Sequence, residues 1–180
     1  MTALRLVAEL MELAARTAPK AIGQDYIVQR VIEGEVLQAL GRGMIEHGRA
    51  KGIPGFERDG GNVLQSEALL LVGLKDARTC GLNCGACGEA VCLEINTFEG
   101  EFRGPQCSLR LLDLGIALGS AVKTASLLNA DNRIMYRAGV VARAQGLIDA
   151  DVVMGVPLAA AGKSPYFDRP AVPAPAVRAG

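Results

Sequence analysis

The five cysteines of the chain all lie between residues 80 and 107, and they constrain its folding more than any other feature of the sequence. Cys84, Cys87 and Cys92 have the spacing C-x-x-C-x-x-x-x-C, and Cys107 follows behind a Gly-Pro pair. Four thiolates with this spacing can ligate one centre. A [4Fe-4S] cluster takes one thiolate per iron, and a two-residue spacer lets one loop present neighbouring ligands. The spacing therefore favours an iron–sulfur segment.

Glycines separate the thiols at Gly81, Gly85 and Gly88. A residue without a Cβ tolerates a positive φ and lets backbone N–H groups approach the sulfur atoms. Hydrogen bonds of that kind stabilise an added electron on a cluster. The glycines therefore fit a loop that wraps around a metal centre.

Three other uses of the cysteines compete with this interpretation. Zinc also accepts four thiolates, but structural zinc sites usually pair two C-x-x-C hooks, and this segment has one. A disulfide framework is disfavoured because the cysteine count is odd and the N-terminus does not resemble a secretory signal. Cys80, Cys84 and Cys87 also match the C-x-x-x-C-x-x-C pattern of radical S-adenosylmethionine enzymes. Those enzymes resemble large barrels, which 180 residues with few strand candidates do not supply.

The stretch NCGACGEAVC, together with the later Cys107, resembles a known iron–sulfur module. The module occurs in the corrinoid iron–sulfur protein large subunit and in an electron-transport complex subunit with the same motif. The resemblance implies that Cys84, Cys87, Cys92 and Cys107 are the ligands and that Cys80 is an additional thiol.

A wider resemblance covers most of the chain. It is carried by APKAIGQDYI, FERDGGNVLQSEALLLVG, LDLGIALGSAV, DNRIMYRAG, GVPL and GKSPYFDR. Together these stretches resemble the uncharacterised ferredoxin-domain-containing proteins of anaerobic prokaryotes. The resemblance implies a cluster and no particular reaction.

A fainter resemblance is to flavin-dependent nitroreductases. It rests on an early APK-like turn, a helix containing LGS and a late strand ending in VPL. The resemblance implies that Arg16, Lys20 and Lys163 meet the phosphate of a flavin such as FMN, and that backbone near Gly119 and Ser120 approaches its ring. The paired arginines that usually begin those enzymes are absent from this chain.

Composition limits the class of protein. Half of the residues are apolar, which is enough for one domain with a sizeable core, and the formal net charge is zero. No basic field argues for nucleic acid. No uncharged apolar run reaches the roughly 18 to 20 residues of a membrane helix, since the best candidate contains Asp113. Reduced cysteines and an oxygen-sensitive cluster point to the cytoplasm.

Outside the cysteines, helical and strand patterns alternate. The short apolar run EALLLVGL, bounded by turn residues, is typical of a strand covered on both faces. Ser108 can cap a helix whose polar positions, Arg110, Asp113, Ser120 and Thr124, form only a narrow stripe. This pattern predicts a central buried helix whose positive end lies beside the cluster. The predicted elements are helices over 3–16, 26–47 with a break at Gly34, 109–128 and 134–144, the last capped by Asp131 and Asn132; a loop over 48–61; and strands over 67–74 and 151–156.

Polar residues gather in predicted loops, and loops carry function more often than cores do. We interpret them as helix caps and ion pairs, and they remain candidates for lining a site. They are Arg58, Asp59, Asn62, Asp131, Asn132, Arg133, Asp168 and Arg169.

We therefore expect an α+β domain, mainly helical around a small sheet and nitroreductase-like by resemblance, with an iron–sulfur loop insertion. Residues 1–79 and 108–160 would form one scaffold, residues 80–107 the cluster-binding segment and residues 161–180 a proline-rich tail. The expected function is one-electron transfer to a bound flavin or a partner enzyme. A flavin-dependent oxidoreductase and a zinc-stapled interaction module without turnover are the alternatives. Long apolar helices favour a homodimer.

Overall fold

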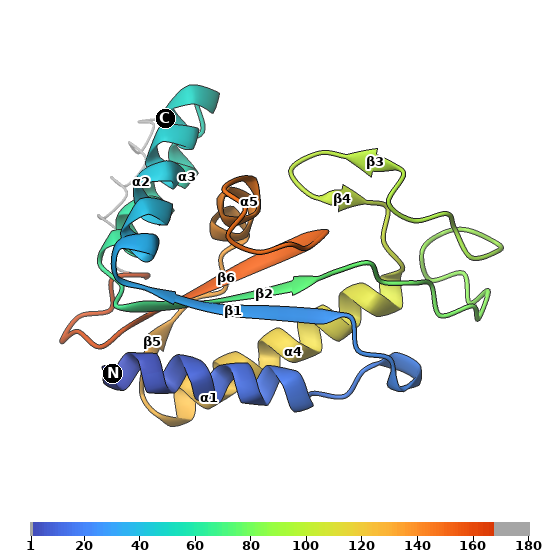
Figure 1. The fold of residues 1–180 in the computed structure, drawn as a ribbon, viewed down its shortest axis with the longest axis horizontal. Helices are drawn as coiled ribbons and strands as arrows, with labels where there is room; N and C mark the ends of the chain where they lie inside the picture. The colour runs from blue at the N-terminus through green and yellow to red at the C-terminus, as the bar shows by residue number, and fades with distance from the viewer. Residues whose placement is uncertain (1, 168–180) are drawn as a thin grey trace, which may run out of the picture.

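The fold is built around a four-stranded sheet, in a computed structural model that describes residues 2–167. The strand order is β1-β2-β6-β5, and every neighbouring pair is antiparallel (Figure 1). All residues of β2 are buried, because β2 is flanked by a strand on each side and covered on both faces. The strands are β1 (Ile27–Glu33), β2 (Ala68–Leu74), β6 (Val152–Ala159) and β5 (Asp131–Asn132).

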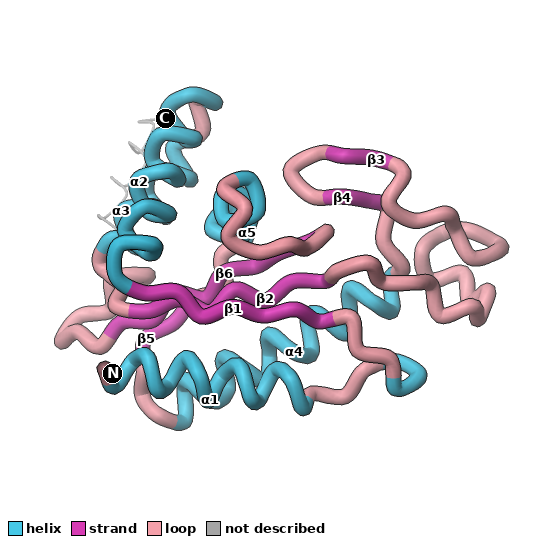
Figure 2. The backbone as a smooth tube through the Cα atoms, in the orientation of Figure 1, coloured by secondary structure: helices cyan, strands magenta, loops and turns pink. Residues whose placement is uncertain are grey.

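Helices cover both faces of the sheet and form two apolar cores. α1 (Ala3–Thr17) and α4 (Ser108–Leu127) cover one face, and α2 (Gly34–Lys51), α3 (Pro54–Leu64) and α5 (Tyr136–Ala144) lie on the other (Figure 2). Alternation along β2 supplies both cores, since successive side chains of a strand point to opposite faces. Leu70, Val72 and Leu74 enter the core beneath α1 and α4, and Leu69 and Leu71 enter the other.

The cysteine segment leaves the sheet at the end of β2 and returns at the start of α4. It projects beyond the sheet and contains a short hairpin of β3 (Phe98–Glu99) and β4 (Arg103–Gly104) (Figure 1). The scaffold therefore holds this segment by elements at both of its ends.

Several predicted elements are confirmed, with shifts of a few residues at their ends. These are α1, β2, α4, α5 and β6. Each rests on a strong period in the apolar residues or on an apolar run with clear turn signals.

The helix predicted over residues 26–47 is wrong in its first part. Residues Ile27–Glu33 form β1, which pairs along its whole length with β2, and α2 begins only at Gly34. Gly34 has a φ of 58°, a left-handed conformation that glycine adopts without a Cβ clash. The expected break at this glycine is therefore a change from strand to helix.

The loop predicted over residues 48–61 is also wrong, because α2 continues to Lys51 and α3 starts at Pro54. The glycines there allow close packing of two helices. A Cβ on Gly60 would lie 2.8 Å from the carbonyl oxygen of Gly41, and one on Gly48 would lie 2.9 Å from the Cβ of Phe56. The glycine-rich composition predicted a loop, whereas the structure has two closely packed helices there.

The predicted caps and the predicted burial of α4 need correction. Cys107, not Ser108, occupies the cap position of α4, and Asp131 and Asn132 form β5 instead of capping α5. α4 is not buried all round: Arg110 and Asp113 point inward, while apolar side chains on its other face are exposed. These two members of the polar stripe are thus part of the buried face.

Most of the predicted tail over residues 161–180 lies outside the described residues. Within residues 2–167, none of the helices combines the length and the apolar character that crossing a membrane would require.

Replacement of Gly139 by Ala should destabilise the scaffold. The new Cβ would lie 1.9 Å from the carbonyl oxygen of Val153 in β6, so α5 must move away from the sheet. We expect the free energy of unfolding to fall by about 3 kcal/mol, as for overpacked cores. The matched control is Gly115→Ala in α4, where a Cβ meets no atom within 4 Å and helix propensity improves by up to about 1 kcal/mol. Denaturant unfolding of both variants checks the pair, and equal effects would contradict it.

Candidate metal centre

All five cysteines line one cavity beside the N-terminus of α4. Cys80 and Cys107 are buried, Cys92 is half-buried, and Cys84 and Cys87 are exposed. None of the five forms a disulfide. The fold therefore gathers the four thiols predicted as ligands, together with the additional Cys80, although Cys107 is distant from the other ligands in sequence.

The loop around the thiols uses the glycines as predicted. Gly81, Gly85 and Gly88 have φ values of 69°, 73° and 92°, which side chains with a Cβ rarely adopt. The loop also closes on itself, because the backbone N–H of Cys92 donates to Oδ1 of Asn83 at 2.8 Å. That contact brings Cys92 next to the residue that precedes Cys84.

The sulfur of Cys107 accepts hydrogen bonds from several backbone N–H groups. Burial acts to raise the pKa of the Cys107 thiol, but hydrogen bonds from the backbone N–H groups of Cys80, Leu109 and Arg110 outweigh burial and lower the pKa below its ordinary value. Two of these donors belong to the first turn of α4, where the helix dipole is positive. Such a site favours a thiolate, which is the form that binds metal.

Cys80 is paired with Cys107 inside the cavity. The Cys80 thiol donates a hydrogen bond to the Cys107 sulfur. Burial raises the pKa of Cys80, and the charge of Arg110 opposes that rise. The sequence left Cys80 without a role, and the structure places it against a predicted ligand.

The thiols suit a soft metal centre, although in this conformation they are farther apart than the ligands of one metal ion would be. Across residues 2–167, no three His, Cys, Asp or Glu side chains are close enough to hold a metal ion in this conformation. Thiolates select zinc or iron–sulfur clusters over hard cations, and backbone donors near sulfur are typical of cluster sites. The assignment of Cys84, Cys87, Cys92 and Cys107 as the four residues that would hold a cluster stays a prediction.

A buried carboxylate ties the cysteine segment to the scaffold. Asp151 is 2% exposed and lies just before β6. It accepts hydrogen bonds from the backbone N–H of Asp76 at 2.7 Å, from the side chain of Asn96 at 3.3 Å and from Arg103 at 3.4 Å. Asp151 therefore fixes the chain at one point before the segment and at two points within it. A carboxylate beside the apolar run of β6 was the only sequence signal of this role.

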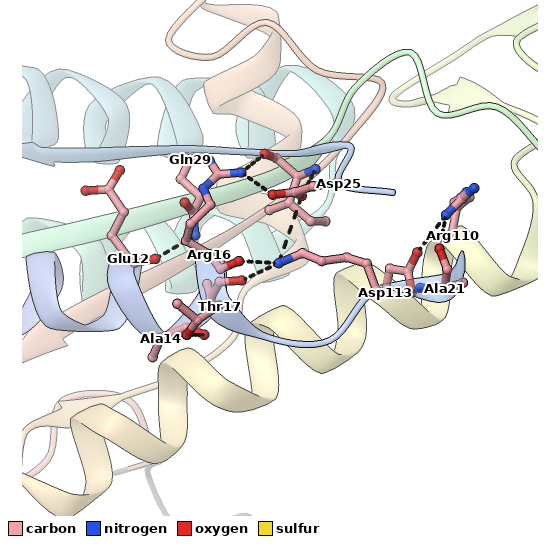
Figure 3. Close-up of polar contacts among 12 residues, drawn as sticks. Glu12, Ala14, Arg16, Thr17, Ala21, Asp25, Gln29, Arg110 and Asp113 are labelled. Atoms are coloured by element: carbon pink, nitrogen blue, oxygen red, sulfur yellow. Dashed lines mark hydrogen bonds and ion pairs between the residues drawn. The ribbon is translucent and has the colours of Figure 1, made fainter. Parts of the chain in front are cut away.

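A buried arginine lies at the start of α4, one turn after Cys107. Arg110 has no exposed surface and donates to the carbonyl oxygens of Arg78 at 2.9 Å and Ala21 at 3.0 Å. Its partner Asp113 is 3.3 Å away and accepts from the backbone N–H of Ala21 at 2.7 Å (Figure 3). Both side chains belong to the predicted polar stripe, and the sequence alone did not reveal that they form a buried pair.

Two of the residues predicted to meet a flavin phosphate are close together at the end of α1. Arg16 contacts Asp25 at 2.7 Å and the carbonyl oxygen of Ile27 at 2.8 Å (Figure 3). Lys20 lies 3.9 Å from the same carboxylate. Burial acts to raise the pKa of Asp25, but the N–H of Ile27 and the two cations outweigh it and lower the pKa.

The other predicted flavin residues lie elsewhere on the scaffold. Gly119 is exposed on α4, and Ser120 lines a groove between α4 and the end of α1. Lys163 follows the other end of the sheet: β6 ends beside Ala68, whereas β1 begins beside Leu74. The flavin assignment stays a prediction.

Three of the polar residues predicted to lie in loops, Arg58, Asp59 and Arg133, form ion pairs, and Arg58 and Asp59 lie in α3 instead of a loop. Asp59 is buried and lies 2.7 Å from Arg58, 3.6 Å from Arg133 and 2.8 Å from Arg137, the last of which the sequence analysis missed. Asp168 and Arg169 lie outside the described residues.

Comparison with known proteins gives two results on sequence. Residues 103–169 match a family described as "Uncharacterized protein containing a ferredoxin domain", a range that contains Cys107 and α4. An uncharacterized protein of Archaeoglobus fulgidus is 50% identical over 168 residues, which cover 92% of this chain and 91% of that protein.

Solved structures with a similar fold include nitroreductases. An FMN-dependent nitroreductase from Mycobacterium smegmatis in complex with NADPH is 9% identical and has a TM-score of 0.56 over 87% of this chain and 78% of its own. A nitroreductase with bound FMN from Bacteroides fragilis is 13% identical and has a TM-score of 0.56 over 100% of this chain and 88% of its own. The chain therefore has a nitroreductase-like α+β fold, as the resemblance implied.

Replacement of Cys107 by Ser should remove the cluster, and replacement of Cys80 by Ser should leave it bound. Cys107 is the thiol that backbone N–H groups stabilise as a thiolate, while Cys80 donates to it. Iron analysis and the paramagnetic signal of the reduced protein measure both variants after anaerobic reconstitution. We expect about four irons per chain in Cys80→Ser and nearly none in Cys107→Ser, since each iron takes one thiolate. The reverse result would assign Cys80, Cys84, Cys87 and Cys92 as the ligands.

Proposed function

The chain belongs to a family of uncharacterized proteins that contain a ferredoxin domain, and on that premise we propose that it binds one [4Fe-4S] cluster and transfers single electrons. The observation that carries the proposal is the convergence of all five cysteines on one cavity. Cys84, Cys87, Cys92 and Cys107 would be the ligands. A bound [4Fe-4S] cluster supplies the ability to accept and release one electron.

The chain's own residues support this role in two ways. The N–H groups at the start of α4 are directed at Cys107, which stabilises negative charge on its sulfur. The exposed side of the loop carries Cys84 and Cys87. A redox partner can therefore approach from solvent on the side of these two thiols, while Cys107 connects the site to the scaffold.

A flavin-dependent oxidoreductase is the second candidate, because the fold is nitroreductase-like and solved relatives of that fold hold FMN. In this version the electron passes to a flavin on the same chain, with Arg16 and Lys20 toward its phosphate and Gly119 and Ser120 toward its ring. Lys163, which follows the other end of the sheet, would lie outside this site. A zinc-stapled interaction module is the third, since thiolates also hold zinc. Reduced thiols favour the cytoplasm as the compartment for all three.

Anaerobic purification separates these functions. We expect iron and acid-labile sulfide in the protein, with a broad visible absorption that bleaches on reduction. Zinc without iron would contradict the cluster. Incubation with FMN followed by desalting and acid release then tests the flavin, and no retained flavin would remove the oxidoreductase on this chain while leaving the cluster proposal in place.

The protein should form a homodimer through the shared outer face of α1 and α4. Large apolar side chains are exposed there, including Leu13 at 60%, Leu112 at 59% and Leu127 at 73%. Exposed apolar patches of this kind mark interaction surfaces. Light scattering at micromolar concentration should give twice the chain mass, and Leu13→Glu should shift it toward the monomer. Val36→Glu on α2, on the opposite side of the sheet, is the control; a monomeric parent protein would contradict the prediction.

A further inference from the structure

We propose that Arg110 raises the reduction potential of the cluster held by Cys107 and that Asp113 offsets part of this effect. The inference rests on the proposed function and assigns two side chains that are not ligands. Neither side chain would contact the irons, so they act through the electrostatic field at the cluster.

Arg110 is a charge held in one position. Its Nε donates to the carbonyl oxygen of Arg78, its Nη1 to that of Ala21 and its Nη2 to Oε1 of Gln24 at 2.6 Å. Its guanidinium also lies 4.8 Å from the centre of the Tyr26 ring. An arginine with all these partners cannot swing out to solvent, and its pKa is too high for the charge to be lost.

The chain just before the cysteine segment and the helix that follows it both contribute to the surroundings of the Arg110 guanidinium. Cys107 is the cap residue of the helix that carries Arg110, so the two residues are one helical turn apart. Arg78, whose carbonyl oxygen accepts from Arg110, is two residues before Cys80. The guanidinium therefore ties the chain entering the segment to the helix leaving it.

Burial strengthens the electrostatic effect of the Arg110 charge on the cluster. Arg110 is 0% exposed and Asp113 is 4% exposed, so water screens neither of them well. Reduction adds one negative charge to the cluster, and net charge around a cluster is one of the factors that set its potential. A buried cation beside Cys107 stabilises the reduced form, which raises the potential.

Asp113, the anion of the buried pair, lowers the reduction potential of the cluster, and by less than Arg110 raises it. Asp113 lies a further turn along α4, away from the cap residue. Because Arg110 lies one turn nearer to Cys107 along α4, its positive charge outweighs the negative charge of Asp113 at the cavity.

The test measures the midpoint potential of the anaerobically reconstituted holoprotein by redox titration with detection of the paramagnetic reduced state. Arg110→Gln should shift the potential to a more negative value, and Asp113→Asn should shift it to a more positive one. Arg110→Lys keeps the charge and should stay closest to the parent. Arg78→Gln removes an exposed charge two residues from Cys80 and is the matched control, with a smaller shift than Arg110→Gln because solvent screens it.

Opposite shifts in the two buried variants would support the inference, because general loosening of the site moves both in the same direction. Shifts of the same sign, or no shifts, would overturn it. If Arg110→Gln does not fold or retain iron, Asp113→Asn decides: a positive shift supports the inference, and a negative or absent one overturns it. Iron analysis of the parent protein comes first. Its failure to bind iron would overturn the proposed function, whereas bound iron with unshifted potentials overturns this inference alone.

Discussion

The cysteine segment is held between two elements that the scaffold buries, and its arrangement depends on that constraint. β2 is buried throughout its length and leads into the segment, and the first turn of α4 receives the chain at Cys107. A buried strand and a helix packed beneath the sheet cannot move far apart without exposing both apolar cores. The thiols can therefore lie in one cavity even though the loop between them has little regular structure.

Buried polar groups strengthen this connection where apolar packing ends. Asp151 binds the segment from the β6 side, and Arg110 binds it from the α4 side. Removal of one partner of a buried charged pair costs about 3–5 kcal/mol, because the other charge is left uncompensated. The scaffold therefore specifies one position for each end of the segment.

Much of the scaffold could be predicted from the sequence, because strong periods determine helices and strands. EALLLVGL gives β2, and the spaced polar residues of 3–16 give α1. β1 was missed because its partners in the sheet, and not its own pattern, make residues 27–33 a strand. The glycines of α2 and α3 were read as loop signals, since a sequence does not show that Gly60 lies against Gly41.

The candidate thiols could be found from the sequence, and the side chains around them could not. Cysteine spacing indicates the thiols, because residue type and spacing are local properties, and the choice of Cys84, Cys87, Cys92 and Cys107 as ligands stays a prediction. The contacts of Arg110 reach residues 21, 24 and 78, and those of Asp151 reach residues 76, 96 and 103. Contacts over such sequence distances depend on the fold, so no local pattern reveals them.

The hydrogen bonds that Asp76 and Arg103 donate to Asp151 would affect how a cluster is assembled. With both contacts in place, most of the loop-closure entropy of the segment has been lost before any metal arrives. Metal entry then needs only a short stretch around the glycines to change conformation. Small zinc-finger domains, by contrast, fold only when metal binds. In this protein the two apolar cores and the contacts of Asp151 include no cysteine, so we expect the rest of the chain to stay folded when a cluster is inserted or lost.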